Sequence, residues 1–154
     1  DKHMAQEIDD SVNRKIIQLL NENGRRSFTE LANLVGISEA AARQRVNKLV
    51  NSEAIKISAI PDAKALGFHR KALIGIRHQG SMGPLAKKMR DLPEVSKVVV
   101  TAGEFDVLLE VVCKDDEHLV RLINESIRSV DGVQTTETFV YLKEEKQTYE
   151  WIGQ

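Results

Sequence analysis

The sequence predicts an α+β protein in two parts: three helices with a trailing strand, then a unit of the order βαββαβ. Three observations lead to this prediction. Apolar residues recur at helical spacing up to Leu49, whereas β-branched segments alternate with helical ones after Ala72. Residues 25–56 carry six basic against three acidic side chains, while residues 62–154 carry 13 against 15. This change of charge along the chain favours two units with different tasks.

The first two helices are predicted from spacing and end signals. Residues 8–20 place their apolar side chains on one helical face, and Gly24 suits a left-handed helix end. The next helix follows Ser27, whose hydroxyl can cap it while Glu30 reaches back, which is a capping-box pattern. That helix stops at Gly36.

A third helix is predicted after Ser38, a favourable N-cap residue. At 100° per residue, its inward stripe consists of Ala42, Val46 and Leu49. Gln44 and Lys48 then point almost opposite this stripe. The helix is therefore expected to bury one side and to offer amide and cationic groups on the other. Residues 54–60 alternate in the manner of a strand, and residues 61–68 are the expected linker.

The second unit has the rhythm of a ferredoxin-like domain, an antiparallel sheet with both helices on one face. Helices are expected at residues 81–92 and from Asp115–Asp116 to Val130. Strands are expected at residues 72–76, 95–101, 107–113 and 133–142. This plan leaves the other sheet face bare, lined by alternate residues of strands such as 98–100. An apolar face of this size implies a partner, and we expect a dimer through this domain.

The segment Phe28–Leu49 is the informative one for function. A short helix meets a longer one through Gly36, Ile37 and Ser38, which is the helix-turn-helix arrangement; its second helix enters the DNA major groove. Amides and cations on that helix can bond base edges or phosphates. The predicted DNA-contacting residues are Arg25, Arg26, Ser38, Ala40, Ala41, Arg43, Gln44, Arg45, Asn47 and Lys48. A plain unit of three packed helices with a polar outer face would show a similar pattern.

Several classes of protein are disfavoured. The single cysteine, Cys113, permits no intramolecular disulfide and is expected to lie in the core. The histidines lack metal-ligand spacing, and the second half offers no nucleophile–base pair or phosphate-binding loop, so neither a metal site nor an enzyme is expected. No apolar run is long enough for a membrane span, and no secretory leader is visible, so we expect a cytoplasmic, nucleoid-associated protein without a cofactor. Residues 1–4 look like a cloning remnant and a start Met.

The chain resembles a known family of regulators. In the first part the resemblance rests on Asp9, Ile16, Ile17, Leu20, Gly24, Arg25, Glu30, Leu31, Ala32, Val35, Gly36, Ile37, Ser38, Arg45, Val46, Leu49, Ala54 and Ile55. In the second part it rests on Pro93, Glu94, Val95, Val100, Gly103, Glu104, Phe105, Asp106, Leu109, Gly132, Val133, Thr136 and Thr138. These residues are similar to those of the leucine-responsive and asparagine regulators (Lrp/AsnC), over residues 5–147.

This resemblance implies a winged helix-turn-helix over residues 5–60, the linker 61–68, and a ferredoxin-like effector and oligomerisation (RAM) domain over residues 69–154. It also implies double-stranded DNA as partner, dimers that assemble as tetramers of dimers, and an amino-acid effector between neighbouring C-terminal domains. The implied effector residues are Val100, Thr101, Gly103, Glu104, Asp106, Thr136, Phe139, Val140 and Tyr141.

Two interpretations of the turn at Gly103 stay open. Gly103 would let a ligand approach the backbone, and Asp106 could accept a charge-assisted hydrogen bond from an α-ammonium group. Alternatively, both residues only shape a β-turn. The sequence accordingly predicts a DNA-binding regulator that responds to a small effector, with a ligand-independent architectural DNA-binding protein as the alternative.

Overall fold

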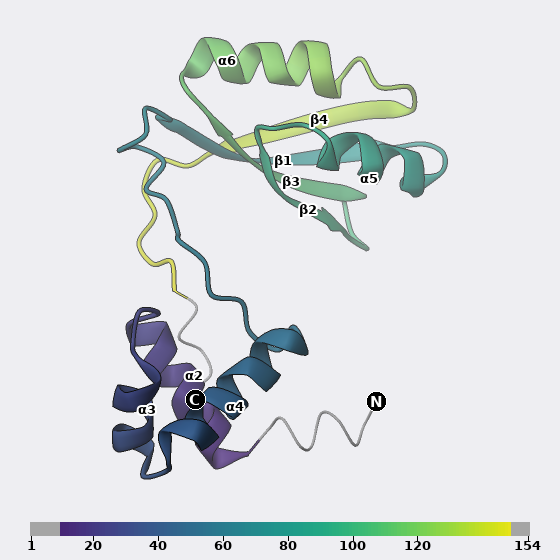
Figure 1. The fold of residues 1–154 in the computed structure, drawn as a ribbon. Helices are drawn as coiled ribbons and strands as arrows, with labels where there is room; N and C mark the ends of the chain where they lie inside the picture. Colours follow the sequence, from purple (N-terminus) through teal and green to yellow (C-terminus); the bar gives the residue numbers. More distant parts are fainter. Residues whose placement is uncertain (1–9, 149–154) are drawn as a thin grey trace. The chain divides into compact units, whose positions relative to one another are not determined.

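The structure is a computed structural model that describes residues 10–148. It separates into two compact units (Figure 1). Among the described residues, the first contains those up to Ile60 together with residues 146–148, and the second is Pro61–Glu145. Each unit has its own core of buried apolar side chains. None of the described helices is long and apolar enough to cross a membrane.

The first unit holds three helices, α2 (Ser11–Glu22), α3 (Phe28–Val35) and α4 (Glu39–Asn51). Their N-caps are Asp10, Ser27 and Ser38, each of which accepts a hydrogen bond from a backbone amide of the first turn. The helices close around fully buried side chains from all three, namely Ile16, Leu31, Ala42 and Leu49. The predicted stripe of the third helix is thus confirmed.

Two local predictions in this unit are wrong. Gly24 is not left-handed: α2 continues to Glu22 and ends at the extended Asn23, whose amide donates to the carbonyl of Leu19. Residues 54–60 form no strand, and the sheet of the described residues does not include them. Alternation of apolar residues cannot supply the hydrogen-bonded partner that a strand requires. Ile55 packs on the helices instead, while Ile57 and Ile60 are exposed.

The second unit follows the predicted βαββαβ order. Its strands are β1 (Arg70–His78), β2 (Val95–Val100), β3 (Val107–Cys113) and β4 (Val133–Val140), and they form one antiparallel sheet in the order β2-β3-β1-β4. α5 (Met82–Arg90) follows β1, and α6 (Asp116–Arg121) follows β3 (Figure 1). Side chains of these helices share one core with β1 and β3, so both helices cover the same sheet face.

The second helix of this unit changes its winding, which the sequence did not predict. After Arg121 it continues as a π-helix, Leu122–Ile127, in which the amide of Arg128 donates to the carbonyl of Ile123. The five-residue spacing of this winding lets both Leu122 and Ile127 point into the core. The spacing of apolar residues alone predicts an ordinary α-helix for such a segment.

The register of the sheet decides which side chains face the helices. Ile74 pairs with Leu109 on one side and with Thr138 on the other, and the two apolar members of this row are fully buried. Cys113 ends β3 in the same core, as predicted, and its burial raises the pKa of the thiol to about 11. The thiol is therefore protonated at neutral pH.

The opposite sheet face carries a second set of apolar side chains. Leu73 and Leu108 alternate with buried positions of β1 and β3, and Val99 of β2 pairs with Leu108. These three side chains are half-buried or exposed. Phe105 folds over this face onto β1, where Gly75 leaves it room, and its ring meets Phe139 edge-on at 6.4 Å between centroids. The helices of the same unit cover only the other face.

Replacing Gly75 with Ala is expected to lower the free energy of unfolding by about 1–3 kcal/mol, because overpacking forces neighbours to move. The added Cβ would lie 2.6 Å from the Phe105 ring. Gly103→Ala is the matched control, since its Cβ would meet no atom within 4 Å, and it should change stability by less than ~0.5 kcal/mol. Urea unfolding followed by circular dichroism measures both variants. Equal stabilities would contradict the close contact at Gly75.

Candidate DNA interface and effector turn

The turn between α3 and α4 has the backbone geometry of a helix-turn-helix. Gly36 ends α3 in the left-handed region with φ 78°, where a side chain would be strained. Ser38 then caps α4, accepting from the amide of Ala41 at 3.1 Å. These two residues fix the direction in which α4 leaves the turn.

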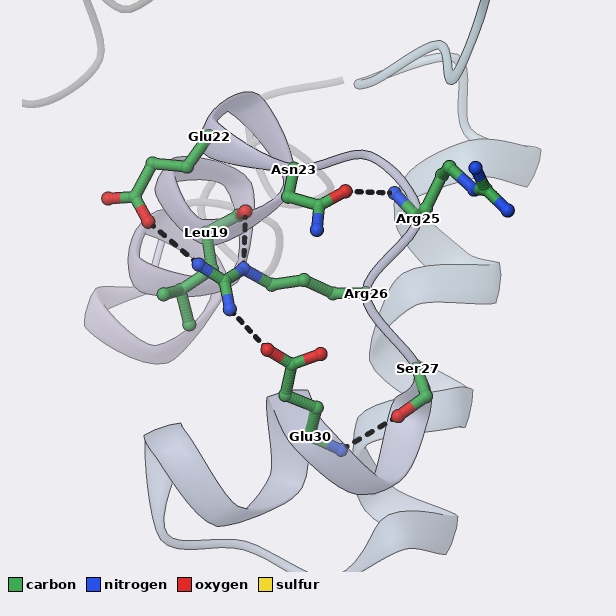
Figure 2. Close-up of polar contacts among 7 residues, drawn as sticks. All are labelled: Leu19, Glu22, Asn23, Arg25, Arg26, Ser27 and Glu30. Carbon is green, nitrogen blue, oxygen red and sulfur yellow. Dashed lines mark hydrogen bonds and ion pairs between the residues drawn. The ribbon is translucent and has the colours of Figure 1, made fainter.

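Arg26 binds within the unit and joins α2 to α3 (Figure 2). Its Nε donates to the carbonyl of Leu19 at 3.0 Å, and its two terminal nitrogens bind Glu22 and Glu30. The guanidinium thus adds a second hydrogen bond to the Leu19 carbonyl, which already accepts from the amide of Asn23 at the end of α2. Arg25 is exposed, and its side chain points away from this group (Figure 2).

Arg45 is also bound within the fold. Its Nη1 donates to Asp10 Oδ2 at 2.6 Å and to Asn13 Oδ1 at 3.0 Å, so it ties α4 to the start of α2. The hydrogen bond from Arg45 and the one from the Asn13 amide lower the pKa of Asp10 below its ordinary value of 3.8. Asn13 is the buried polar residue at this junction.

The outward face of α4 carries the remaining predicted contacts. Ala40, Arg43, Gln44, Asn47 and Lys48 are exposed, and Ala41 is half-buried. Arg43 does not extend freely, because its Nη2 donates to Glu39 Oε1 at 3.1 Å while its guanidinium lies 4.7 Å from the centre of the Phe28 ring. The face therefore combines amides, small side chains and cations on one regular helix.

The turn between β2 and β3 is held by its own residues. Thr101 donates through its amide to the carbonyl of Asp106 and through its hydroxyl to that of Phe105. The Asp106 carboxylate accepts from the amide of His78 at 2.8 Å, which attaches the turn to the end of β1. Glu104 forms an exposed ion pair with Arg77, and the space beside Gly103 is open.

The predicted effector residues on β4 and just beyond it have different surroundings. Thr136 accepts a hydrogen bond from Arg128, while Phe139 and Val140 are exposed by 45% and 42%. Tyr141 donates its hydroxyl to Glu110 at 2.9 Å. Burial, followed by this bond to Glu110, raises the pKa of Tyr141 to about 12, so the hydroxyl stays protonated.

The sheet keeps Val100 of the first group of predicted effector residues apart from Thr136 of the second. Val100 and Thr136 stand in the same row, but on the edge strands β2 and β4, with Val107 and Ile76 between them. Three strand spacings of about 4.8 Å separate them by roughly 14 Å. Within the turn, Asp106 and Phe105 are the residues that extend toward β1, through the contacts of Asp106 with His78 and of Phe105 with Gly75.

Comparison with known proteins agrees with both units. Residues 10–50 match the model of the AsnC-type helix-turn-helix domain, and residues 71–151 match that of the Lrp/AsnC ligand binding domain. The HTH-type transcriptional regulator FL11 of Pyrococcus horikoshii is 32% identical over 92% of this chain and 94% of its own. The chain belongs to the Lrp/AsnC family of transcription regulators.

Solved structures of Lrp/AsnC-type regulators have the same fold. A transcriptional regulator of Neisseria meningitidis, solved as a complex with L-Met, is 26% identical, with a TM-score of 0.86 over 92% of this chain and 95% of its own. AsnC of E. coli is 28% identical, with a TM-score of 0.82 over 90% of this chain and 95% of its own. The predictions of a transcription regulator with these two domains are thereby confirmed.

Sequence reasoning on this Lrp/AsnC regulator missed several residues of the first unit. The pair Glu39–Arg43 carries a visible signal, since opposite charges four residues apart face each other on a helix. Asp10 and Asn13 could not be found as partners of Arg45 in this way, because they lie 35 and 32 residues away in sequence. The sequence pattern therefore gave no sign that Arg26 and Arg45 have partners within the unit.

Substitution of Arg26 and of its neighbour Arg25 should distinguish a residue that stabilises the fold from one that is available for DNA contact. Arg26→Ala is expected to lower the free energy of unfolding by about 1–2 kcal/mol, because three acceptors lose a charged donor. Arg25→Ala should leave stability within ~0.5 kcal/mol. Thermal unfolding of the full chain followed by circular dichroism compares the two. A loss for Arg25→Ala as large as that for Arg26→Ala would refute the assigned role of Arg26.

Proposed function

We propose that this regulator reads a specific double-stranded DNA sequence with the outward face of α4, and that an amino acid changes this binding. The observation that carries the proposal is the division of α4 into two sides. Ala42, Val46 and Leu49 are buried, which leaves Gln44 and Asn47 outward on the same helix. Side-chain amides can make paired hydrogen bonds with adenine in the major groove.

The other predicted DNA residues have supporting roles in this proposal. Arg25, Arg43 and Lys48 contribute positive charge around the amides, and Ala40 and Ala41 allow close approach to the bases. Arg26 and Arg45 are assigned to holding α2, α3 and α4 together, since their guanidinium groups bind acceptors of the same unit. Residues 5–60 are the proposed DNA-binding part, 61–68 the linker and 69–154 the effector part.

A second copy of the chain is the proposed partner of the open sheet face. Val99 and Phe139 are exposed there by 37% and 45%, beside the half-buried Leu73, Leu108 and Phe105. Leaving such an apolar face in water is unfavourable for a soluble domain. The resulting dimer would present two copies of α4, and a two-fold symmetric protein favours a pseudo-palindromic DNA site. Tetramers of dimers remain the proposed larger assembly.

The proposed effector is an amino acid that contacts the turn at residues 101–106. Support comes from the related Neisseria regulator that was solved with L-Met, and from the chemistry of the turn. The Asp106 carboxylate could accept from an α-ammonium group, and nothing stands beside Gly103 to prevent close approach. Glu104 adds a second carboxylate at this turn, and Thr136, Phe139, Val140 and Tyr141 of a neighbouring copy would complete the site.

DNA binding is tested with a fluorescent duplex from upstream of the regulator's own gene and with a scrambled duplex of equal composition. The full chain is expected to prefer the first duplex and to bind more weakly as salt rises, because displaced counterions set that dependence. Gln44→Ala should lower the preference by about 5- to 150-fold, as for one lost bidentate base contact. Gln79→Ala in the second unit is the matched control and should bind as the wild type does.

The same anisotropy titration, run with the duplex at a concentration well above the dissociation constant, gives the number of chains bound per duplex. Two chains, or a multiple of two, are expected for a dimer on a symmetric site. One chain per duplex would contradict the proposed dimer, and no preference over scrambled DNA would contradict sequence-specific reading.

The effector is tested by calorimetric titration of the full chain with each of the twenty amino acids. At least one is expected to give saturable heat, and Asp106→Asn should weaken its binding about tenfold or more, because a charge-assisted hydrogen bond is lost. The amide of Asn can still accept from His78, so the turn is preserved. Glu117→Gln on α6 removes an exposed charge elsewhere as control. Absence of saturable heat would favour the ligand-independent architectural alternative.

A further inference from the structure

The start of α4 holds a polar cluster around Glu39, a residue that has no role in the DNA interface described above. Glu39 receives two hydrogen bonds, from Thr29 Oγ1 to Oε2 at 2.8 Å and from Arg43 Nη2 to Oε1 at 3.1 Å. Thr29 belongs to α3, so the carboxylate is held by both helices of the helix-turn-helix. Both oxygens of Glu39 are therefore engaged before any DNA is present.

The cluster also determines where Arg43 lies. Its guanidinium is placed between the Glu39 carboxylate and the face of the Phe28 ring, 4.7 Å from the ring centre. Both contacts favour the cation in this position. The side chain is still 55% exposed, so a stronger anion outside the unit could draw it away.

Glu39 carries its negative charge at neutral pH. The hydrogen bond from Thr29, followed by the one from Arg43, lowers the pKa of Glu39 below its ordinary value of 4.5. A carboxylate in the first turn also suits the positive end of a helix. Nevertheless, its 49% exposed side chain stands on the helix that would approach a polyanion, where it repels every phosphate.

We propose that Glu39 is a specificity-determining residue of the DNA interface, positioned by Thr29 and acting on Arg43. On arbitrary DNA, Glu39 competes with phosphates for the Arg43 guanidinium and so withholds one sequence-independent contact. On the correct site, Glu39 accepts a hydrogen bond from the exocyclic amino group of a cytosine, which releases Arg43 to DNA. Among the bases, cytosine offers this donor in the major groove without an adjacent acceptor. The inference rests on the proposed function of α4.

A purely structural role for the cluster makes a different prediction. If Glu39 only stabilised the start of α4, its replacement would change stability and leave the salt dependence of DNA binding unaltered. The salt dependence is therefore the informative readout, because it counts the phosphates that the protein neutralises.

Glu39→Gln tests the charge with little change of shape. Binding of the full chain to the scrambled duplex and to the upstream duplex is measured by anisotropy from about 50 to 200 mM salt. On scrambled DNA the variant should bind about fivefold more tightly at the lowest salt, and the slope of log K against log salt should steepen by about one. The preference for the upstream duplex should fall about tenfold, as for one lost base contact.

Two further variants make the result specific. Thr29→Val removes the hydroxyl that holds Glu39 and should change the slope in the same direction by a smaller amount. Glu53→Gln, beyond the C-terminal end of α4, removes the same charge and should leave slope and preference unchanged. Thermal unfolding of each variant verifies that the fold is intact.

An unchanged slope and unchanged affinity for scrambled DNA in Glu39→Gln would overturn the inference. So would an equal effect of Glu53→Gln, because the change would then reflect net charge alone. If the wild-type chain itself showed no preference between the duplexes, the proposed function would fail first. Failure of the proposed function is distinguishable from failure of this inference, since it is seen with the wild-type chain and does not depend on any Glu39 variant.

Discussion

The burial of one stripe of α4 is the constraint on which the proposed DNA interface depends. Val46 and Leu49 can reach the core only if the helix is rotated so that they face α2 and α3. At 3.6 residues per turn this rotation leaves no choice for the other side. The outward position of Gln44 and Asn47 is thus a consequence of packing.

The arginines show how the fold competes with function for the same residue type. Arg26 and Arg45 bind acceptors of their own unit, whereas Arg25 is exposed, although all belong to the basic segment of the sequence. A guanidinium is suited to both tasks, because its several donors can satisfy helix carbonyls and carboxylates as well as phosphates. Its partner, rather than its presence in a basic stretch, decides which task it performs.

The range over which a contact acts along the chain explains what the sequence could and could not predict. The helices, their caps and the βαββαβ order follow from local signals such as Ser27, Ser38 and Gly36, whose physical effects act over a few residues. The expected strand at residues 54–60 failed because pairing is non-local, and the π-helix failed because apolar spacing does not report hydrogen bonding. The partners Asp10 and Asn13 of Arg45 were missed for the same reason: they meet it only after folding.

In the second unit, the geometry of one sheet bears on how an effector could act at a distance. Val100 and Thr136 lie on opposite edge strands, and the row between them spans roughly 14 Å, whereas Asp106 is hydrogen-bonded to β1, the neighbour of β4. One amino acid is too small to bridge that distance within a single copy. If Val100 and Thr136 contact the same effector, we infer that they come from two copies, and effector binding then favours the assembly that joins them. By reciprocity, assembly on DNA would raise the affinity for the effector by the same factor. The coupling would require no change inside either unit, because the variable that both ligands influence is how copies associate.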